Sequence, residues 1–477
     1  PPYQPPAAPE PVTSPWQLVE LFETALADTG TQTNAHNLER LLDGTVTEHN
    51  RDRTEFTDAL RSLTTRYPAD GIDPWDQRTL PGALRCLLYA ILGEDRRTVS
   101  IMNELYSDAQ TPLPPDRAVV YRIYELVENL GKARIPGLLA TPTHGDGTID
   151  PEVLRFRLER YTNAAAEPLP CDLEQALLRV PADDAQRILA SSPLLATPAG
   201  KQLAALFAWG ESALPFFERF VIRRRPGDRD GAETGAVHAP RIAPRFSPPH
   251  DLIGAIDRPP SPITVLARLP DPDEVHLFAW NGSSAHAALW PSLLPLHPEL
   301  VAAHAIPALY QQANDTARDR NGLLPALAAT AGWPGPVTHL ALAYGLAAGR
   351  PENRAGAVEA LVTLAARTLL DARALGSLCG ELWASRMIKP NRLLSALDAA
   401  AQAGARREVF TAAAAALPTL ARQPSVRGLA DLLVLAADCA RAADLHGQLP
   451  ELAALTTLEK PSRVATEARR LRRILGN

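Results

Sequence analysis

The stretches PVTHLALAYGLAAGR (336–350), PENRAGAVEALVTLAARTLL (351–370) and DARALGSLCGELWASRMIK (371–389) decide the fold of this chain. Each is rich in Ala and Leu, which are strong helix formers, and each opens on Pro or Asp, which favour a helix start. The pattern predicts helices that begin near Pro336, Glu352, Asp371, Asn391, Arg406 and Ser425. These starts are 15 to 20 residues apart, so a helix pair recurs every 34 to 39 residues, as in stacked helical repeats.

The composition favours a mainly α fold for the whole chain. Of its 477 residues, 46% are hydrophobic but only 5% are aromatic. Such a chain suits close helix packing better than sandwiches or barrels, which need aromatic and β-branched residues. Its length predicts two or three domains. We therefore expect an α-solenoid of HEAT-like helical repeats with a small β-hairpin insertion.

Interruptions of the helical pattern mark the domain boundaries. A stretch rich in Pro, Gly, Arg and Asp predicts a flexible linker, and two runs of β-forming residues around a Pro-Asp-Pro-Asp turn predict the hairpin, over 263–269 and 274–280. The predicted segments are a proline-rich linker (1–14), an N-terminal helical-repeat domain (15–222), a flexible linker or loop (223–262), a β-hairpin with its connecting segment (263–322) and a C-terminal helical-repeat domain (323–477). The proline-rich start, in which Glu10 is the one charged residue, also suggests an excerpt from a longer polypeptide.

Charge and cysteine usage narrow the functional classes. The net charge of −6 indicates no overall footprint for nucleic acid or membrane, although residues 324–477 carry 18 Lys and Arg against 12 Asp and Glu. Only four of the 48 basic residues are lysines, so arginine enrichment is weak evidence for phosphate binding. The four cysteines are too widely spaced for a zinc site and too few for a disulfide framework. No transmembrane segment or signal peptide is predicted, and a cytoplasmic location fits best.

One local sequence, LLATPTHGDGTIDP (138–151), concentrates polar side chains beside two glycines. His144, Asp146 and Asp150 are a weak candidate for a metal or phosphate site. The simpler interpretation is structural, because Asp150 precedes Pro151 as a cap precedes the first residue of a helix, while Gly145 and Gly147 allow the turn.

Two basic clusters are candidates for an interaction surface. The first is Arg223-Arg224-Arg225, and the second comprises Arg469, Arg470, Arg472 and Arg473 in the final predicted helix. That helix carries an apolar stripe, so its arginines would form the solvated face of a terminal cap. The alternative is an electropositive surface for RNA, DNA or an acidic protein.

Several stretches resemble a family of large, uncharacterised HEAT-like helical-repeat proteins of high-GC Gram-positive bacteria. The matching sequences, in chain order, are LLATPTH (138–144) with IDP (149–151), DLEQALL (172–178), KPNRLL (389–394), RGLADLL (427–433) and ARRLRR (468–473). The resemblance implies an α-solenoid and transfers no catalytic residue. Some members are linked with AAA-type ATPases and von Willebrand A-like proteins, which implies a scaffold or adaptor with such a partner.

Functional motifs are scarce in the sequence. No P-loop, helical H-E-x-x-H motif or nucleophile elbow occurs, so no catalytic, metal-binding or cofactor-binding residue is assigned. The leading hypothesis is a non-enzymatic protein-interaction scaffold or adaptor. The alternative is a nucleic-acid-binding helical-repeat protein that uses the basic C-terminal block, and a hydrolase or metalloenzyme at His144 and Asp146 ranks third.

Overall fold

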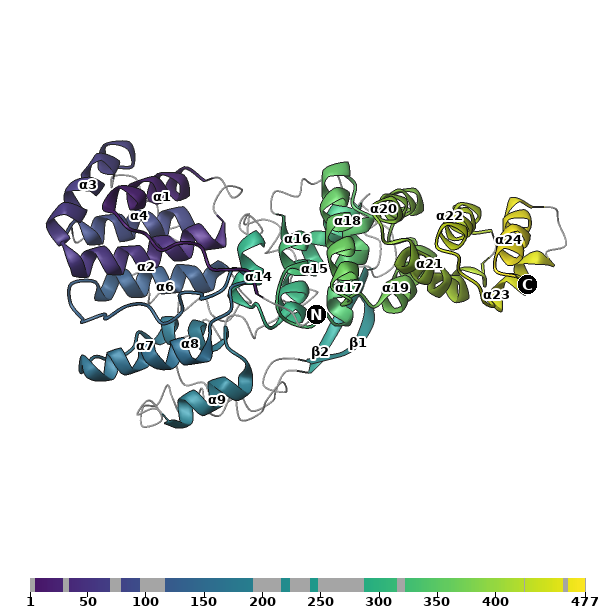
Figure 1. Cartoon of the computed structure of the whole chain (residues 1–477). Helices are drawn as coiled ribbons and strands as arrows, with labels where there is room; N and C mark the ends of the chain where they lie inside the picture. Colours follow the sequence, from purple (N-terminus) through teal and green to yellow (C-terminus); the bar gives the residue numbers. More distant parts are fainter. Residues whose placement is uncertain are drawn as a thin grey trace.

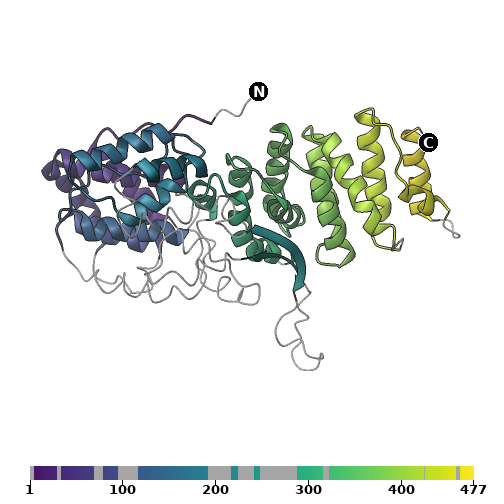
Figure 2. The same cartoon turned by 90° about the horizontal axis from the view of Figure 1, so that it is seen from below.

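The protein is mainly helical and elongated. A bundle of helices lies at one end, and a row of helices extends from it (Figures 1 and 2). No helix within the described ranges is long and apolar enough to cross a membrane. The computed structural model describes residues 5–28, 34–68, 79–94, 116–191, 216–223, 241–247, 287–314, 322–423, 425–457 and 462–476.

The bundle, which we call the N-terminal unit (residues 5–191), comprises α1 (Pro15–Ala27), α2 (Ala35–Arg51), α3 (Arg53–Arg66), α4 (Leu80–Ile91), α6 (Asp116–Asn129), α7 (Pro151–Asn163), α8 (Pro170–Leu177) and α9 (Ala182–Ser191). Side-chain oxygens cap several of these helices, as Ser14 does for α1 and Asn34 for α2. Helix α1 packs on α2, α3 and α4, and α6 lies between α4 and α8. This arrangement brings α2, α6 and α8 around a common interior.

The proline-rich segment that was predicted as a linker is packed against the unit over its described part. Ala7 forms an antiparallel bridge with His144, and Pro6 O accepts a hydrogen bond from Gly145 N at 2.7 Å. Val12 is buried against Gly44, where an added Cβ would lie only 3.0 Å from the valine Cβ. The burial of Val12 and these backbone contacts hold the segment against the unit. The composition of the segment alone did not reveal this packing.

The helices beyond the bundle form the C-terminal row (residues 287–476). It consists of a 3-10 turn η5 (Ala287–Leu289), α14 (Trp290–Leu293), α15 (Pro298–Asn314), α16 (Leu323–Ala328), α17 (Pro336–Leu346), α18 (Pro351–Ala366), α19 (Ala372–Ala384), α20 (Pro390–Gln402), α21 (Arg406–Leu420), α22 (Leu429–Ala442), α23 (Glu451–Thr456) and α24 (Arg463–Ile474). The row therefore starts upstream of residue 323, because residues 287–314, assigned in part to a connecting segment, are largely helical.

Four odd-numbered helices of the row stack in parallel, with their N-termini along one edge. Glu299 in the first turn of α15 accepts hydrogen bonds from Gly335 N, Val337 N and Thr338 N at the start of α17, at 3.0, 2.9 and 2.8 Å. His339 in α17 then accepts one from the N–H of Asp371, the N-cap of α19, at 2.9 Å. The start of α15 is thereby bonded to that of α17, and the start of α17 to that of α19.

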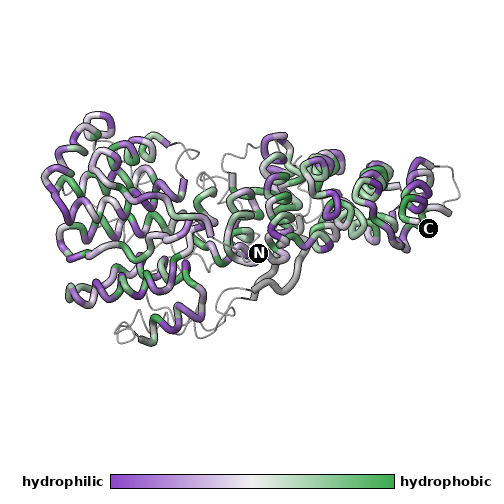
Figure 3. The backbone as a smooth tube through the Cα atoms, viewed as in Figure 1, coloured by the Kyte–Doolittle hydropathy of each residue, from purple (hydrophilic) through white to green (hydrophobic). Residues whose placement is uncertain are grey.

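Small side chains let α19 and α21 approach closely. A Cβ on Gly376 would lie 2.7 Å from Ala412 Cα, and one on Gly380 would lie 3.1 Å from Ala416 Cα. Both pairs are offset by the same number of residues, which confirms that these helices run parallel. Apolar residues (green in Figure 3) alternate with polar ones along these helices, as expected where one face packs on neighbours and the other does not.

The described strands are β1 (Phe216–Arg223) and β2 (Arg241–Ser247), which pair antiparallel. Two predictions are corrected here, because β1 lies at the end of the predicted N-terminal helical domain and β2 within the predicted flexible linker. Strand β1 is rich in aromatic and β-branched residues, which favour strands over loops, whereas β2 has only Ile242 and Phe246 of this kind and contains Pro244. The hairpin predicted over 263–280 is not seen, since it falls outside the described residues.

The predicted helix starts in the row agree closely with the structure at five positions, within one residue. The sixth, Ser425, is wrong by four residues, since α22 begins at Leu429. Gly428 before it has φ +91°, and an added Cβ there would lie 3.0 Å from Trp383. The left-handed backbone at this glycine sets the helix start, and a capping serine does not.

Candidate functional site

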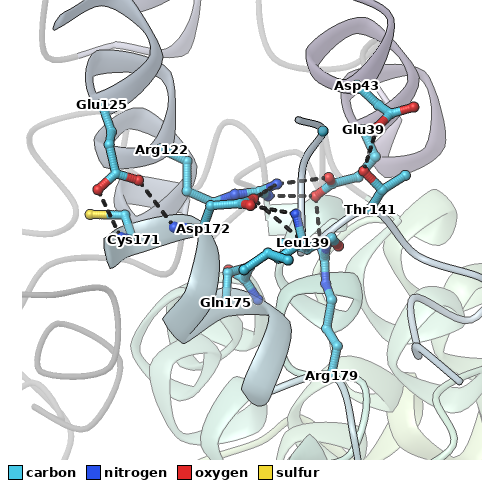
Figure 4. A network of polar contacts seen from close by, with 12 residues as sticks. Glu39, Asp43, Arg122, Glu125, Leu139, Thr141, Cys171, Asp172, Gln175 and Arg179 are labelled. Atoms are coloured by element: carbon cyan, nitrogen blue, oxygen red, sulfur yellow. Dashed lines mark hydrogen bonds and ion pairs between the residues drawn. The ribbon is translucent and has the colours of Figure 1, made fainter. Parts of the chain in front are cut away.

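The densest cluster of charged side chains in the described chain is buried inside the N-terminal unit. It consists of Glu39 from α2, Arg122 from α6, Asp172 from α8 and Arg179, just after α8 (Figure 4). Their side chains are 6%, 2%, 2% and 0% exposed. We call this cluster the ionic junction. Buried charges are tolerated when they are paired and hydrogen-bonded, and these four meet that condition.

Arg122 and Glu39 form the centre of the junction. Arg122 Nη1 and Nη2 donate to the two oxygens of Glu39 at 2.7 and 3.1 Å, a bidentate pair, and Nη2 also lies 3.2 Å from Asp172 Oδ1. Arg179 Nη2 donates to Glu39 Oε1 at 2.7 Å. Glu39 therefore bridges two guanidinium groups from different parts of the chain.

The junction also binds the loop between α6 and α7. Asp172 accepts hydrogen bonds from Leu139 N at 2.6 Å and from Ala140 N at 3.3 Å, and Arg179 Nη1 donates to Ala140 O. At the border of the cluster, Thr141 Oγ1 donates to Asp43 at 2.9 Å. These bonds satisfy the loop main chain, which would otherwise be buried without partners.

Two side chains extend from α8 and its C-terminal turn to the C-terminal row. Gln175 Nε2 donates to Leu293 O at 2.7 Å, and Arg179 Nε donates to Ser292 O at 3.2 Å. At Gly147, with φ +93°, an added Cβ would lie 2.7 Å from the same Ser292 O. The ionic junction is thus continuous with the contact between the N-terminal unit and α14.

Burial and charge oppose each other at Glu39. Burial acts to raise its pKa, but attraction to Arg122 and Arg179, with the hydrogen bonds they donate, outweighs burial and lowers the pKa to about 2. Glu39 is therefore ionised at neutral pH, and its charge is balanced by the two arginines.

Glu125, a neighbouring carboxyl on α6, behaves in the opposite way. Its oxygens accept hydrogen bonds from Cys171 N at 2.9 Å and Asp172 N at 3.1 Å, at the start of α8. Burial is the largest effect and raises its pKa to about 8, with a further contribution from the negative charge of Asp172, although the two N–H donors act in the opposite direction. Burial also raises the pKa of the Cys171 thiol. Glu125 is thus mainly protonated at neutral pH.

These geometries suit a structural joint better than a reaction centre. The charged groups of the junction bond to one another and to main-chain groups, with Arg122 Nε left as a buried nitrogen without a hydrogen-bond partner, and all four are almost inaccessible to solvent. A substrate or metal would have to displace those internal partners. Among the described residues, no group of three His, Cys, Asp or Glu side chains is arranged to hold a metal ion.

The weak polar-site candidate forms a turn whose side chains bond to each other. Asp146 Oδ1 accepts from Thr148 N at 2.9 Å and from Thr148 Oγ1 at 2.6 Å, and His144 Nδ1 lies 3.1 Å from the same hydroxyl. Asp150 accepts from Glu152 N at 2.8 Å and caps α7. The structural interpretation of Asp150 is confirmed, and its carboxylate points to the helix start.

The two basic clusters differ in how much of them is described. Arg223 ends β1, whereas Arg224 and Arg225 lie outside the described residues. In α24, Arg470 pairs with Asp438 of α22 at 2.7 Å, and Arg469 Nη2 donates to Thr456 O at 3.1 Å. Arg472 and Arg473 are exposed on the same helix. In the α24 cluster, Arg469 and Arg470 therefore bond to neighbouring segments, whereas Arg472 and Arg473 face the solvent.

Reasoning from the sequence missed the ionic junction entirely. A usable signal was present, because each arginine lies within an apolar run: Arg122 between Tyr121 and Ile123, and Arg179 between Leu178 and Val180. A charged residue inside such a run is either misplaced or paired in the core. The identity of the partner could not be deduced, since Glu39 is 83 residues away from Arg122 in the chain.

Two family models match the chain. Residues 27–213 match a domain of unknown function, DUF7824, and residues 279–459 match a second one, DUF7825. The four junction residues lie in the first matched segment, while Ser292 and Leu293 lie in the second. No curated protein and no solved structure matches the chain. The ionic junction is therefore located where the two matched segments meet.

Proposed function

We propose that this protein is a non-enzymatic interaction scaffold, built as an α-solenoid of HEAT-like helical repeats. The supporting observation is the parallel stacking of α15, α17, α19 and α21, with the starts of the first three helices bonded in sequence and α21 packed closely on the glycines of α19. Helices α17, α19 and α21 begin at Pro336, Ala372 and Arg406, a repeat of 36 and then 34 residues. This period lies near those of known solenoid families.

A stack of this kind favours binding over chemistry. In a helical-repeat stack the helices bury apolar faces against their neighbours, and the outward residues of successive repeats accumulate into an extended surface. The ionic junction is used inside the N-terminal unit, and its Arg179 also bonds to Ser292 of the row. Other molecules can then bind to the extended surface of the helices, and such a surface suits a protein partner.

The resemblance to HEAT-like proteins of high-GC Gram-positive bacteria suggests the kind of system. An AAA-type ATPase or a von Willebrand A-like protein is the partner that this resemblance favours. We further propose a cytoplasmic setting, in which the four buried, unpaired thiols would stay reduced.

Affinity capture from native lysate with the full chain tests the scaffold. Discrete protein partners that survive both nuclease and high salt are the expected result. Retention of no protein above the level of an unrelated helical protein of equal charge would contradict it. The bound species would be identified by mass spectrometry.

A second candidate is nucleic-acid binding through α24. It is favoured by one observation, the exposure of Arg469, Arg472 and Arg473 on one terminal helix. Phosphate contacts release counterions, so affinity for a 20-nucleotide single-stranded RNA should fall log-linearly with salt, with the slope reduced in R472E/R473E. A flat salt dependence, or an unchanged slope in that variant, removes this candidate.

A further inference from the structure

One exposed aromatic side chain in the row stands on an unusually constrained loop. Trp333, between α16 and α17, is 73% exposed, whereas Trp290 and Trp383 are each 3% exposed. An exposed indole leaves a large apolar surface in water, which folding itself does not require. The contacts of the neighbouring residues therefore indicate whether the fold holds this side chain at the surface.

The residues on either side of Trp333 fix its position. Gly332 N donates to Pro295 O at 2.8 Å, and an added Cβ at Gly332 would lie 2.6 Å from Leu296 O. On the other side, Gly335 N donates to Glu299 Oε1 at 3.0 Å, and a Cβ there would lie 2.6 Å from Glu299 Oε2. At Gly332 a side chain would clash with the main chain of Leu296, and at Gly335 it would displace the Glu299 carboxylate from its hydrogen bonds, so the loop is held against α15 while Trp333 stays exposed.

The same edge of the row continues past Trp333. Because the starts of α17, α19 and α21 lie side by side, the loops before them form a line, which we call the α17–α21 edge (residues 329–336, 367–373 and 403–407). Arg367 binds this line together, since its guanidinium donates to Ala328 O and, at 2.8 Å, to Thr330 O. Leu369 and Leu370, half-buried, follow on the next loop.

Three arginines on the edge lie at helix N-termini, where a basic side chain lowers helix stability. Arg373 lies in the first turn of α19, and Arg406 and Arg407 lie in the first turn of α21, all exposed. A helix N-terminus carries partial positive charge, so basic side chains there are unfavourable for helix stability. Within the described part of the chain no ion pair compensates them. Their positive charge is therefore available to a partner.

We infer that the α17–α21 edge is a docking surface for an acidic segment of a partner protein that offers an apolar pocket for the Trp333 indole. This inference rests on the proposed scaffold function and names the chemistry of its partner. A rigidly held tryptophan loses little conformational entropy on binding, and tryptophan and arginine dominate binding energy at protein interfaces. A preformed pocket benefits from such rigidity, whereas a lipid surface accepts aromatic side chains in many orientations.

The first test is photocross-linking in source cells with the full chain carrying p-benzoylphenylalanine at position 333. A matched control carries the same group at position 16, where Trp16 is 62% exposed on α1. The expected result is a protein adduct specific to position 333, whose cross-linked peptide has an excess of Asp and Glu. An adduct with nucleic acid, lipid, a second copy or a basic peptide, or no adduct, overturns the inference.

The second test measures the affinity of the purified full chain for the cross-linked protein. Trp333→Ala should weaken binding at least tenfold, and the triple variant R373E/R406E/R407E should weaken it to a similar extent. Glutamate suits a helix N-terminus, so this charge reversal preserves the fold, which circular dichroism verifies. Trp16→Ala should stay within twofold of the parent. If Trp333→Ala also stays within twofold, the edge is not the surface, even where affinity capture has confirmed a scaffold.

Discussion

The N-terminal unit and the C-terminal row build their cores from different polar groups. Buried polar residues of the unit include Glu39, Arg122, Asp172 and Arg179, four charged groups that converge on one point. Those of the described row are neutral or imidazole side chains, namely His304, Thr330, Thr338, His339 and Asn353. The buried charges of the unit are therefore concentrated in the ionic junction, whereas the buried polar groups of the row make separate local contacts.

This difference has consequences for how each part responds to change. Loss of one charge in the unit leaves two arginines or two carboxylates to share a single opposite charge inside the core, so the cost is concentrated. A change in the row alters one contact between neighbouring helices, and the other helix pairs keep theirs. The following predictions compare the two parts, beginning with the largest expected effect.

Glu39→Gln should be the most damaging single substitution. It preserves side-chain size but removes the carboxylate that pairs with Arg179 and leaves Arg122 with Asp172 alone, and breaking a buried pair costs about 3–5 kcal/mol. Urea unfolding followed by circular dichroism measures the loss. The control is Glu159→Gln on α7, at a side chain 51% exposed, which should change the free energy of unfolding by less than ~1 kcal/mol. A cost of Glu39→Gln equal to that of the control would refute the concentrated role of the ionic junction.

Glu125 should make the stability of the unit depend on pH. Its folded pKa of about 8 is higher than its unfolded value of about 4.5, so the folded state holds a proton that the unfolded state releases as pH rises. Stability from this group is complete below about pH 4.5 and is lost progressively up to about pH 8, with a slope of at most ~1.4 kcal/mol per pH unit.

The check is to compare the wild type with Glu125→Gln by urea unfolding at intervals between pH 5 and pH 9. The variant should show a flatter profile over this range. Glu39, whose folded pKa is about 2, contributes stability that is lost only as pH falls from about 4.5 toward 2, so it does not interfere. Parallel profiles for the two proteins would show that Glu125 is ionised in the folded state.

Gly376→Ala should destabilise the row, and Gly356→Ala should not. At Gly376 the new methyl group would meet the α21 backbone, and overpacking of this kind costs about 1–3 kcal/mol. At Gly356 in α18 the nearest atoms are 3.6 Å away, so alanine gains up to ~1 kcal/mol of helix propensity. Thermal unfolding of both variants gives the sign of each effect. Equal shifts in the same direction would show that close approach of α19 and α21 does not matter.

Arg470→Ala should have the smallest effect. Its ion pair with Asp438 docks α24 on α22, but the two side chains are 36% and 52% exposed, and exposed pairs contribute about 0–1 kcal/mol. Urea unfolding should place this variant within ~1 kcal/mol of the wild type. A loss comparable to that of Glu39→Gln would mean that terminal helices are held by charge rather than by the apolar stripe through Leu471.

The sequence by itself determined the helical class, the repeat spacing and most helix starts of the row, because propensity, capping and periodicity act over a few residues. Asp150 as a cap followed from the same local rules. The ionic junction was decided only by tertiary structure. Glu39, Arg122 and Arg179 are far apart in the chain, and which charges meet depends on how α2, α6 and α8 pack. The packing of residues 5–13, the β1–β2 pairing and the exposure of Trp333 likewise depend on long-range contacts, which no local pattern records.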